Sequence, residues 1–465
     1  MRINMSKLLA VMLVPTMLVA GLAACGPTPP PAVVKETVVV EKTVVVEKTV
    51  SVEKEVVKEV VVTPTPEPEA PTSVPEPKIL YIGGTQSLTG AYAEDSAAIL
   101  AGFEDYAKYV NETKLLAPWR TEKFPADVTL ENLWRDDELK PEKALSIYEE
   151  LKAKGILVYR ISGSPIALAL KDRLNEDRIG ATTMAVGPYL LSPPQTIFAQ
   201  YPIYTDSLAD IADWFKENWK ETRAPRVAYL TADNSMGKSI LIPEMDAYLT
   251  EAGFEVVGSQ LVPLVPTAPP TTQLMWLKEN EVDLALGVMI NPGSQPTIKE
   301  AVRLDMGPDL GYKITFGFAV PSHLQVFATA MGELGNGVLV AGGYPSWDDP
   351  GPGVTFINDL QTKYRPDKKI THVMYMHGVV EAMIQVEALR LAMQVVPFEE
   401  LKPVDVLEYG FYKIQNLDTG GITSTPLTFG PGDVEGMDEI RVQQVQGGKI
   451  VDLGTWPLHH IYKHL

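Results

Sequence analysis

The sequence contains a single cysteine, Cys25, among 465 residues. No disulfide can therefore form within the chain, and the folded part must be stabilised by its hydrophobic core. Positive charge is also scarce, because 59 acidic residues against 40 lysines and arginines give a net charge of −19. A surface of this sign argues against nucleic acid as a partner, and against binding to anionic lipid through charge.

The N-terminal apolar run, Leu8 to Leu22, is too short and too broken by Pro15 to predict a membrane-spanning helix. Arg2 and Lys7 place positive charge before it, and small residues follow it. This order of a basic start, an apolar stretch and a small-residue cleavage site is typical of a secretory signal peptide. The sequence therefore predicts a signal peptide over residues 1–24 and export across the cytoplasmic membrane.

Cys25 stands directly after that apolar stretch, in the order Leu22-Ala-Ala-Cys25-Gly26. The tetrapeptide Leu22-Ala-Ala-Cys25 resembles the bacterial lipobox, in which the cysteine is lipidated and becomes the mature N-terminus. The alternative is an ordinary signal peptide with an incidental cysteine. The interpretation favoured by the position of the only cysteine is a lipoprotein, anchored to the outer face of the membrane through lipidated Cys25.

Residues 25–77 predict a stalk. Proline-rich ends flank a repeat with a six-residue period, Thr-Val-Val-Val-Glu-Lys, which begins at Thr37. The period is not a coiled-coil heptad, and valine and threonine favour extended chain. About 50 extended residues span at most about 170 Å, enough to hold a domain away from a membrane. Oligomerisation through stacked valine-rich strands is the alternative, and the Glu-Lys pairs oppose it.

Residues 78–465 alternate between strand-like and helix-like segments. Strands are predicted at 79–83, 128–133, 155–161, 226–230, 254–261, 284–290 and 313–316, and helices at 97–111, 141–154, 165–175, 240–252, 271–280 and 297–304. Repeated βαβ units predict parallel sheets covered by helices on both faces. Because these units are too many for one sheet, the predicted fold class is α/β with two doubly wound parallel-sheet lobes.

One strand-to-helix junction, Ile161-Ser162-Gly163-Ser164-Pro165, has the features of an anion site. Ser164 is expected to cap a helix that starts at Pro165. Ligands of open α/β sheets bind beyond the carboxyl ends of strands, near helix N-termini. Free backbone N–H groups and serine hydroxyls would there bind a carboxylate, although a plain capping motif with no ligand remains the alternative.

Three groups of motifs occur in order along this part of the chain. They are Ile82-Gly-Gly84 with Thr89-Gly90 and Gly102, then Ala228 to Gly237 with its Asp-x-x-x-Gly turn, and finally 418–423, 429–433 and 448–456. Together they resemble the branched-chain amino-acid-binding proteins, which have the periplasmic binding fold of type I. The resemblance covers nearly all of residues 78–465.

This resemblance implies two lobes that are joined by a three-stranded hinge and close on a small molecule. It places the first lobe at about 78–203 and 338–425, and the second at about 204–337 and 426–465. The implied function is capture of an amino acid or a related carboxylate or amide and its delivery to ABC permease subunits, with no catalysis and no cofactor. A ligand-sensing receptor domain for a signalling partner is the alternative. A secreted hydrolase is disfavoured because no Gly-x-Ser-x-Gly elbow occurs.

The family's binding positions can be placed on this sequence one by one. The resemblance assigns the ligand carboxylate to Ser162, Gly163 and Ser164, the next strand end to Thr183, Met184, Ala185 and Val186, and side-chain positions to Asp95 and Met236. The acid that usually pairs with the ligand ammonium falls near Phe318, where no acid stands. A buried ammonium needs a carboxylate partner.

Two hypotheses follow from that departure. Either Asp95 replaces the missing acid from the other lobe, or the ligand is not an ordinary amino acid. In the second case the aromatic residues Tyr92, Tyr204, Phe318 and Trp347 could shape the pocket, although core packing is the simpler explanation for each of them.

Other groups of residues predict no further chemistry. His459, His460 and His464 lie close together, but without cysteine or a carboxylate near them in sequence they predict no metal site. The segment from Ala232 to Ser239 nearly matches a phosphate-binding loop, but an alanine replaces its first glycine.

Overall fold

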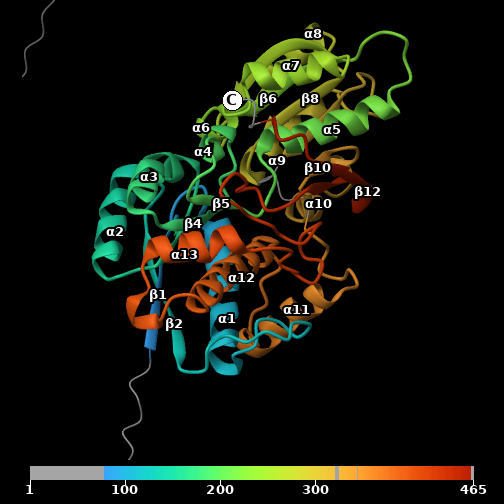
Figure 1. Cartoon of the computed structure of the whole chain (residues 1–465). Helices are drawn as coiled ribbons and strands as arrows, with labels where there is room; N and C mark the ends of the chain where they lie inside the picture. The colour runs from blue at the N-terminus through green and yellow to red at the C-terminus, as the bar shows by residue number, and fades with distance from the viewer. Residues whose placement is uncertain (1–77, 320–323, 343, 462–465) are drawn as a thin grey trace, which may run out of the picture. The chain divides into compact units, whose positions relative to one another are not determined.

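The computed structural model describes residues 78–319, 324–342 and 344–461 (Figure 1). The predicted signal peptide, Cys25, the stalk and His464 lie outside these residues. Within the described ranges, no helix is both long enough and apolar enough to cross a membrane.

The first half of the described chain builds a five-stranded parallel sheet in the order β2-β1-β3-β4-β5. Its strands are β1 (Lys78–Gln86), β2 (Val128–Asp136), β3 (Val158–Ile161), β4 (Gly180–Thr183) and β5 (Ile197–Ala199). All residues of β3 and β4 are buried, as expected for central strands with helices on both faces. The predicted strands at 79–83 and 128–133 are each extended by three residues at their carboxyl ends.

The second sheet has seven strands in the order β12-β11-β10-β9-β8-β6-β7. Five of them are parallel, namely β6 (Arg226–Ala232), β7 (Glu255–Val262), β8 (Leu284–Val288), β9 (Thr315–Ala319) and β10 (Leu339–Ala341). The hairpin of β11 (Glu439–Gln446) and β12 (Lys449–Pro457) adds an antiparallel edge. The fold class of two parallel-sheet α/β lobes is confirmed, with this hairpin as an addition that the βαβ pattern did not predict.

The helices lie between and around these strands. They are α1 (Ala93–Thr113), α2 (Pro141–Ala153), α3 (Ser164–Asp177), α4 (Pro188–Leu191), α5 (Tyr204–Asn218), α6 (Ser235–Lys238), α7 (Pro243–Glu251), α8 (Thr271–Glu279), α9 (Asn291–Arg303), α10 (Leu324–Met331), α11 (Pro352–Tyr364), α12 (Met374–Met393) and α13 (Pro403–Tyr409). The sequence prediction started α9 six residues late, because Pro296 suggested a boundary and is instead accommodated inside the helix. It also missed α5 and α12, whose buried faces are nearly continuous.

Helix α1 crosses α12 at very short range, and two glycines make this possible (Figure 1). A Cβ on Gly102 would lie 2.0 Å from the carbonyl oxygen of Tyr375, and one on Gly378 would lie 2.0 Å from that of Ile99. Real atoms do not approach so closely, so any side chain at either glycine would force the two helices apart. Gly102, which belongs to the first motif group, thus has a packing role.

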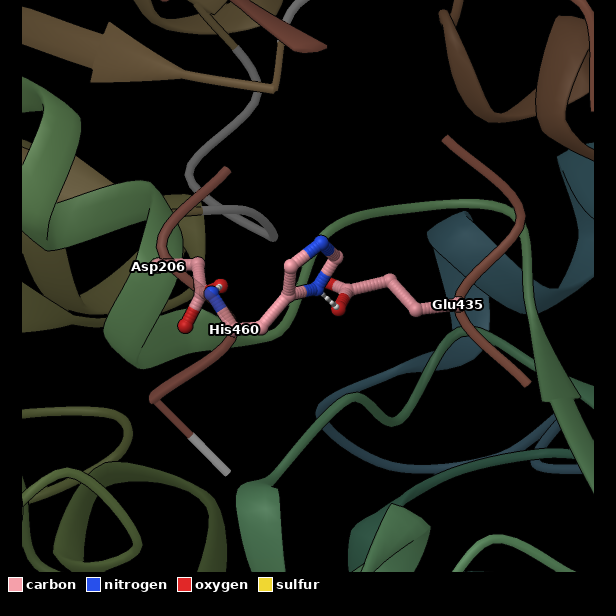
Figure 2. Close-up of side chains that lie close together, drawn as sticks. All are labelled: Asp206, Glu435 and His460. Carbon is pink, nitrogen blue, oxygen red and sulfur yellow. Dashed lines mark hydrogen bonds and ion pairs between the residues drawn. The ribbon is translucent and has the colours of Figure 1, made fainter. Parts of the chain in front are cut away.

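The chain passes between the two sheets three times. It does so between β5 and α5, between β10 and α11, and before β11. Glu435 in the last passage accepts a hydrogen bond from the backbone N–H of Ile203 in the first passage (2.7 Å), and its other oxygen lies 3.3 Å from His460 Nδ1 (Figure 2). A buried carboxylate therefore ties two of the passages together. The lobe boundaries inferred from the resemblance remain a proposal, and β10 belongs to the second sheet.

Candidate functional site

Most residues that the sequence singled out lie where parallel strands end. Ser162 follows β3, Thr183 ends β4, Met236 lies in the short helix after β6, and Phe318 stands one residue before the end of β9. These are the carboxyl ends of strands from both sheets, which is where open α/β folds bind their ligands.

The loops after β1, β2 and β3 are held together by one buried carboxylate, Asp137. Its Oδ1 accepts a hydrogen bond from the hydroxyl of Ser87 (2.7 Å), and its Oδ2 accepts one from the hydroxyl of Ser162. Asp137 and both serines are fully buried. The Ser162 hydroxyl thus donates its hydrogen bond within the protein. The main role of Ser162 is therefore to fix the loop that leads into α3.

Helix α3 begins one residue earlier than predicted. Gly163 is the N-cap, Ser164 is the first helical residue and Pro165 is within the first turn, so the assignment of Ser164 as the cap is wrong. The first N–H groups of a helix have no partner within it and carry the positive end of its dipole. Ser164 is buried and lies near the hydroxyl of Tyr204, so hydrogen-bond donors for an anion at this helix end would face the second lobe.

The segment after β4 is tied down in a similar way. The Thr183 hydroxyl accepts a hydrogen bond from the backbone N–H of Ala185 (2.9 Å), and the Val186 carbonyl accepts one from the N–H of Tyr204 (3.0 Å). Met184 and Val186 are buried. This segment therefore contributes mainly apolar surface, and it connects directly to the first turn of α5.

Met236 from the second lobe meets Tyr92 from the first. The Tyr92 hydroxyl donates a hydrogen bond to Met236 Sδ (3.3 Å), and both side chains are almost fully buried. Burial raises the pKa of Tyr92, so its hydroxyl stays protonated and acts as a donor. The turn that presents Met236 requires Gly237, because a Cβ there would lie 2.1 Å from the carbonyl oxygen of Ala232.

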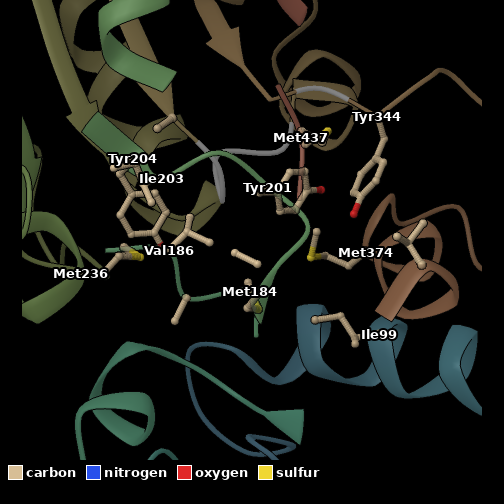
Figure 3. Packing of buried hydrophobic residues seen from close by; sticks show 14 of the residues in the cluster. Ile99, Met184, Val186, Tyr201, Ile203, Tyr204, Met236, Tyr344, Met374 and Met437 are labelled. Atoms are coloured by element: carbon tan, nitrogen blue, oxygen red, sulfur yellow. The ribbon is translucent and has the colours of Figure 1, made fainter. Parts of the chain in front are cut away.

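The buried side chains around these contacts are apolar and rich in methionine and tyrosine (Figure 3). They include Met184, Val186, Ile203, Tyr204, Met236, Met374 and Met437. Methionine adapts its shape, and tyrosine offers a large apolar body with one polar group. In this structure these side chains pack against one another as core, and they offer mainly apolar surface between the strand ends.

Asp95 forms an ion pair with His372. Its Oδ1 lies 3.0 Å from His372 Nε2, and both residues are less than a tenth exposed. Beside this pair is a hollow of about 810 Å³, which is lined by His372, Trp347 and Glu94 together with residues of α10 and the turn between β11 and β12. Asp95 is thus engaged with a histidine of the protein, at the edge of a space large enough for a small ligand.

Phe318 is completely buried inside the second sheet. It pairs with Gly287 of β8 and with Val340 of β10. It supplies no charge at the position where the resemblance expects an acid.

Behind the strand ends of the first lobe lies a buried charged network centred on Arg160 of β3. Arg160 Nε donates to Glu381 Oε2 (2.7 Å), and its Nη1 donates to Gln86 Oε1 (2.5 Å). Burial alone would raise the pKa of Glu381, but Arg160 and His377 outweigh it and hold that pKa below its usual value. Gln86 ends β1, so this network fixes the position of a strand end at the candidate site.

The network continues to the passages between the sheets. His377 lies 3.2 Å from Glu381, and its Nδ1 lies 3.1 Å from the Tyr344 hydroxyl, which in turn accepts a hydrogen bond from Gln200 (2.9 Å). Sequence reasoning missed these residues and also His372. The buried polar positions within the apolar run of α12 were the only signal that could have revealed Glu381 and His377.

A family model described as periplasmic binding protein matches residues 80–449 of the chain. Among solved structures, the chain is similar to a branched chain amino acid ABC transporter from Thermus thermophilus with bound valine. The identity is 21%, the TM-score is 0.72, and the match covers 83% of this chain and 98% of the other.

The chain is also similar to two solved structures whose names mention ligands other than amino acids. A fatty acid ABC transporter substrate-binding protein from Thermomonospora curvata is 20% identical, with a TM-score of 0.67 and coverage of 83% of this chain and 94% of that one. A solute binding protein of an ABC transporter from Rhodopseudomonas palustris BisB5, in complex with 3,4-dihydroxy benzoic acid, is 18% identical, with a TM-score of 0.64 and coverage of 82% and 98%. No curated protein matches the chain. At these identities the structures establish a shared fold.

Proposed function

The chain belongs to the periplasmic binding protein family, and we propose that it is the solute-binding component of an ABC importer for a small carboxylate with an apolar body. The family consists of binding proteins without catalytic activity, so the prediction that the chain is not an enzyme is confirmed. The family also implies an extracytoplasmic location. The resemblance inferred from the sequence motifs is confirmed at this level.

The proposed mechanism is capture between the lobes. A ligand carboxylate would accept hydrogen bonds from the N-terminus of α3 at Gly163 and Ser164, and its body would pack on the apolar side chains contributed by both lobes. Because such a ligand contacts both lobes, it stabilises the closed form over the open one. A membrane permease would then recognise the closed form and accept the solute.

Two observations support the choice of a carboxylate over an amino acid. An amino acid would bring an ammonium group that needs a buried carboxylate. Phe318 stands where the resemblance expects that acid, and Asp95, the proposed substitute, is paired with His372 at 3.0 Å. The solved relatives include proteins with valine and with 3,4-dihydroxy benzoic acid, so the fold accommodates both ligand types.

A thermal-shift comparison of matched ligands tests this proposal. Each pair shares one body with and without the ammonium group: valine with 3-methylbutanoate, and phenylalanine with 3-phenylpropanoate. A ligand at a hundred times its dissociation constant adds about 2.7 kcal/mol of stability. We expect stabilisation by a carboxylate and none by its amino-acid counterpart. Stabilisation by the amino acids alone would reject the proposed ligand class. The uncharged amides of the two carboxylates serve as controls, because they keep the body and lack the negative charge.

Membrane attachment through Cys25 is part of the same proposal. It rests on the lipobox-like tetrapeptide before Gly26 and on the repeat that follows it. A Cys25→Ala variant, expressed in a bacterium that processes lipoproteins, should leave the membrane fraction. Equal membrane association of the variant and the parent would reject the anchor.

A further inference from the structure

The last described residues return to helix α5. The Asp206 carboxylate accepts hydrogen bonds from the backbone N–H groups of His460 and Ile461, the latter at 3.0 Å. Asp206 is fully buried, and its neighbour Glu435 faces the ring of His460 (Figure 2). Both oxygens of Asp206 are thus used to hold the chain after β12 in place. That attachment brings the preceding residue, His459, to the next turns of the same helix.

There His459 meets two further carboxylates of α5. Its Nε2 lies 3.1 Å from Asp210 Oδ1 and 2.9 Å from Asp213 Oδ2. Asp206, Asp210 and Asp213 follow one another at spacings of four and three residues, which places them on one face of the helix. The sequence argument that no carboxylate lies near His459 is therefore wrong in the folded chain.

This region has carboxylates without a permanent cation. In the ion pairs among described residues, Asp210 and Asp213 pair with His459 and Glu435 pairs with His460, and neither lysine nor arginine takes part. Asp210 is fully buried, and its Oδ2 has no hydrogen-bond partner among the described residues. A buried carboxylate in this state gains stability from any cation that reaches it.

We propose that Asp210, Asp213 and His459 form a binding site for a divalent transition-metal ion such as Zn²⁺. One imidazole nitrogen and two carboxylate oxygens are ligands that zinc uses, with bonds of about 2.0–2.2 Å. In a tetrahedral site such bonds separate the ligand atoms by about 3.3–3.6 Å. The three ligand atoms already lie within 4.8 Å of one another, with two of the distances near 3 Å, so small shifts would complete the arrangement.

Tyr248 contacts both the imidazole and a carboxylate of this arrangement, because its hydroxyl lies 3.1 Å from His459 Nε2 as well as against Asp213. Its hydroxyl donates to Asp213 Oδ1 (2.6 Å), which leaves Oδ2 directed at His459. A hydrogen bond that orients a metal-binding carboxylate in this way is typical of metal sites. The side chains of Asp213 and His459 are about one quarter exposed, at 28% and 26%, so an ion can reach the site from solvent. The fourth ligand would be a water molecule.

Isothermal titration of the full-length protein with Zn²⁺, after treatment with a chelator, tests the site. We expect one ion per chain with a dissociation constant at or below about 10 µM. Asp210→Asn and His459→Gln should each weaken binding at least about tenfold, and Tyr248→Phe should weaken it by roughly tenfold. Ca²⁺ and Mg²⁺ should bind far more weakly, because they prefer all-oxygen ligands. Cobalt(II) should give the visible absorption of a tetrahedral ion.

Asp177→Asn is the matched control. Asp177 also accepts a hydrogen bond from a tyrosine, Tyr148 (2.7 Å), but it pairs with Lys152 instead of a histidine. Its substitution should leave zinc affinity within about twofold, and circular dichroism should show that every variant is folded. Absence of zinc binding in the parent would overturn the proposal. Zinc binding that survives Asp210→Asn and His459→Gln but is lost in His460→Ala or His464→Ala would overturn it too. The ion would then be held by the other two C-terminal histidines.

Discussion

Two regions of the protein bury carboxylates, and they neutralise them differently. In the first lobe, Glu381 is paired with Arg160, whose guanidinium keeps its charge at every relevant pH. At the start of the second lobe, Asp206 and Asp210 are as deeply buried, but their basic neighbours are the histidines His460 and His459. The first region pairs its buried carboxylate with a permanent cation, whereas the second depends on protons or on an added cation.

The pKa directions record this difference. Arg160 holds the pKa of Glu381 below its usual value in spite of burial. Burial raises the pKa of Asp206 and, to about 7, that of Asp210. Against the effect of burial, hydrogen bonds to Asp210 and Asp213 raise the pKa of His459 to about 10. Burial alone thus does not determine the direction in which the pKa of a carboxylate shifts. The direction also depends on whether the neighbouring positive charge is permanent.

Removing the permanent cation should have the largest effect on stability. Arg160→Met leaves the buried Glu381 without its arginine and with only His377 beside it, and breaking such a buried pair costs about 3–5 kcal/mol of the free energy of unfolding. Urea denaturation followed by circular dichroism measures this loss. The double variant with Glu381→Leu should recover most of it, since no charge is then left unpaired.

Arg178→Met is the control for that experiment. Arg178 pairs with Glu408 at 2.6 Å, but both side chains are nearly half exposed, and such pairs contribute about 0–1 kcal/mol. A similar loss in Arg160→Met and Arg178→Met would contradict the view that the buried network is the stronger of the two.

The pH dependence of stability should separate the two regions next. The folded pKa of Asp210 is raised, so the folded state binds its proton more tightly, and stability is lost as the pH rises from about 4 to about 7. Asp210→Asn removes that loss. Measured with a chelator present, the variant should gain about 3 kcal/mol relative to the parent between about pH 4.5 and pH 7.5.

Glu381→Gln should show the opposite dependence. The pKa of Glu381 is lowered on folding, so its contribution is present above the unfolded pKa and is lost as the pH falls. This variant should therefore be most destabilising near neutral pH and less so in acid. If the stability difference from the parent changed with pH in the same direction for Asp210→Asn and Glu381→Gln, the two regions would not differ in how they neutralise their carboxylates.

The smallest expected effect concerns two tyrosines that donate to aspartates. Tyr248→Phe removes the hydrogen bond to Asp213, and Tyr148→Phe removes the one to Asp177, each at a cost of about 1–2 kcal/mol in the presence of a chelator. Added Zn²⁺ should widen the gap between Tyr248→Phe and the parent while leaving Tyr148→Phe unaffected. Differential scanning calorimetry detects both effects, and an equal response of the two variants to zinc would contradict the comparison.

The sequence predicted the elements that follow a regular βαβ rhythm, and it did so for physical reasons. Buried parallel strands and amphipathic helices have periods that are visible in one chain, so β1, β6 and α8 were placed within a few residues. The hairpin of β11 and β12 and the long helix α12 were missed. All residues of α12 from Met374 to Arg390 are buried, so it has no polar stripe to mark its period.

The candidate site was predictable only in part. The serine-rich turn before α3 follows from local backbone chemistry, so Ser162 to Ser164 could be located from the sequence. The pairing of Asp95 with His372 joins residues 277 positions apart, and that of Asp210 with His459 joins residues 249 apart. No local pattern encodes such contacts, because the topology of the two sheets brings them together.

The claim that both lobes hold the solute is tested most directly by calorimetric titration of a carboxylate ligand into Ser164→Ala and Met236→Ala. Ser164 lies at the N-terminus of α3 in the first lobe, and Met236 lies in α6 of the second. Each substitution should weaken binding by about tenfold, which is about 1.4 kcal/mol, while Ser146→Ala on the exposed face of α2 should change nothing. Unchanged affinity in both site variants would contradict capture between the two lobes.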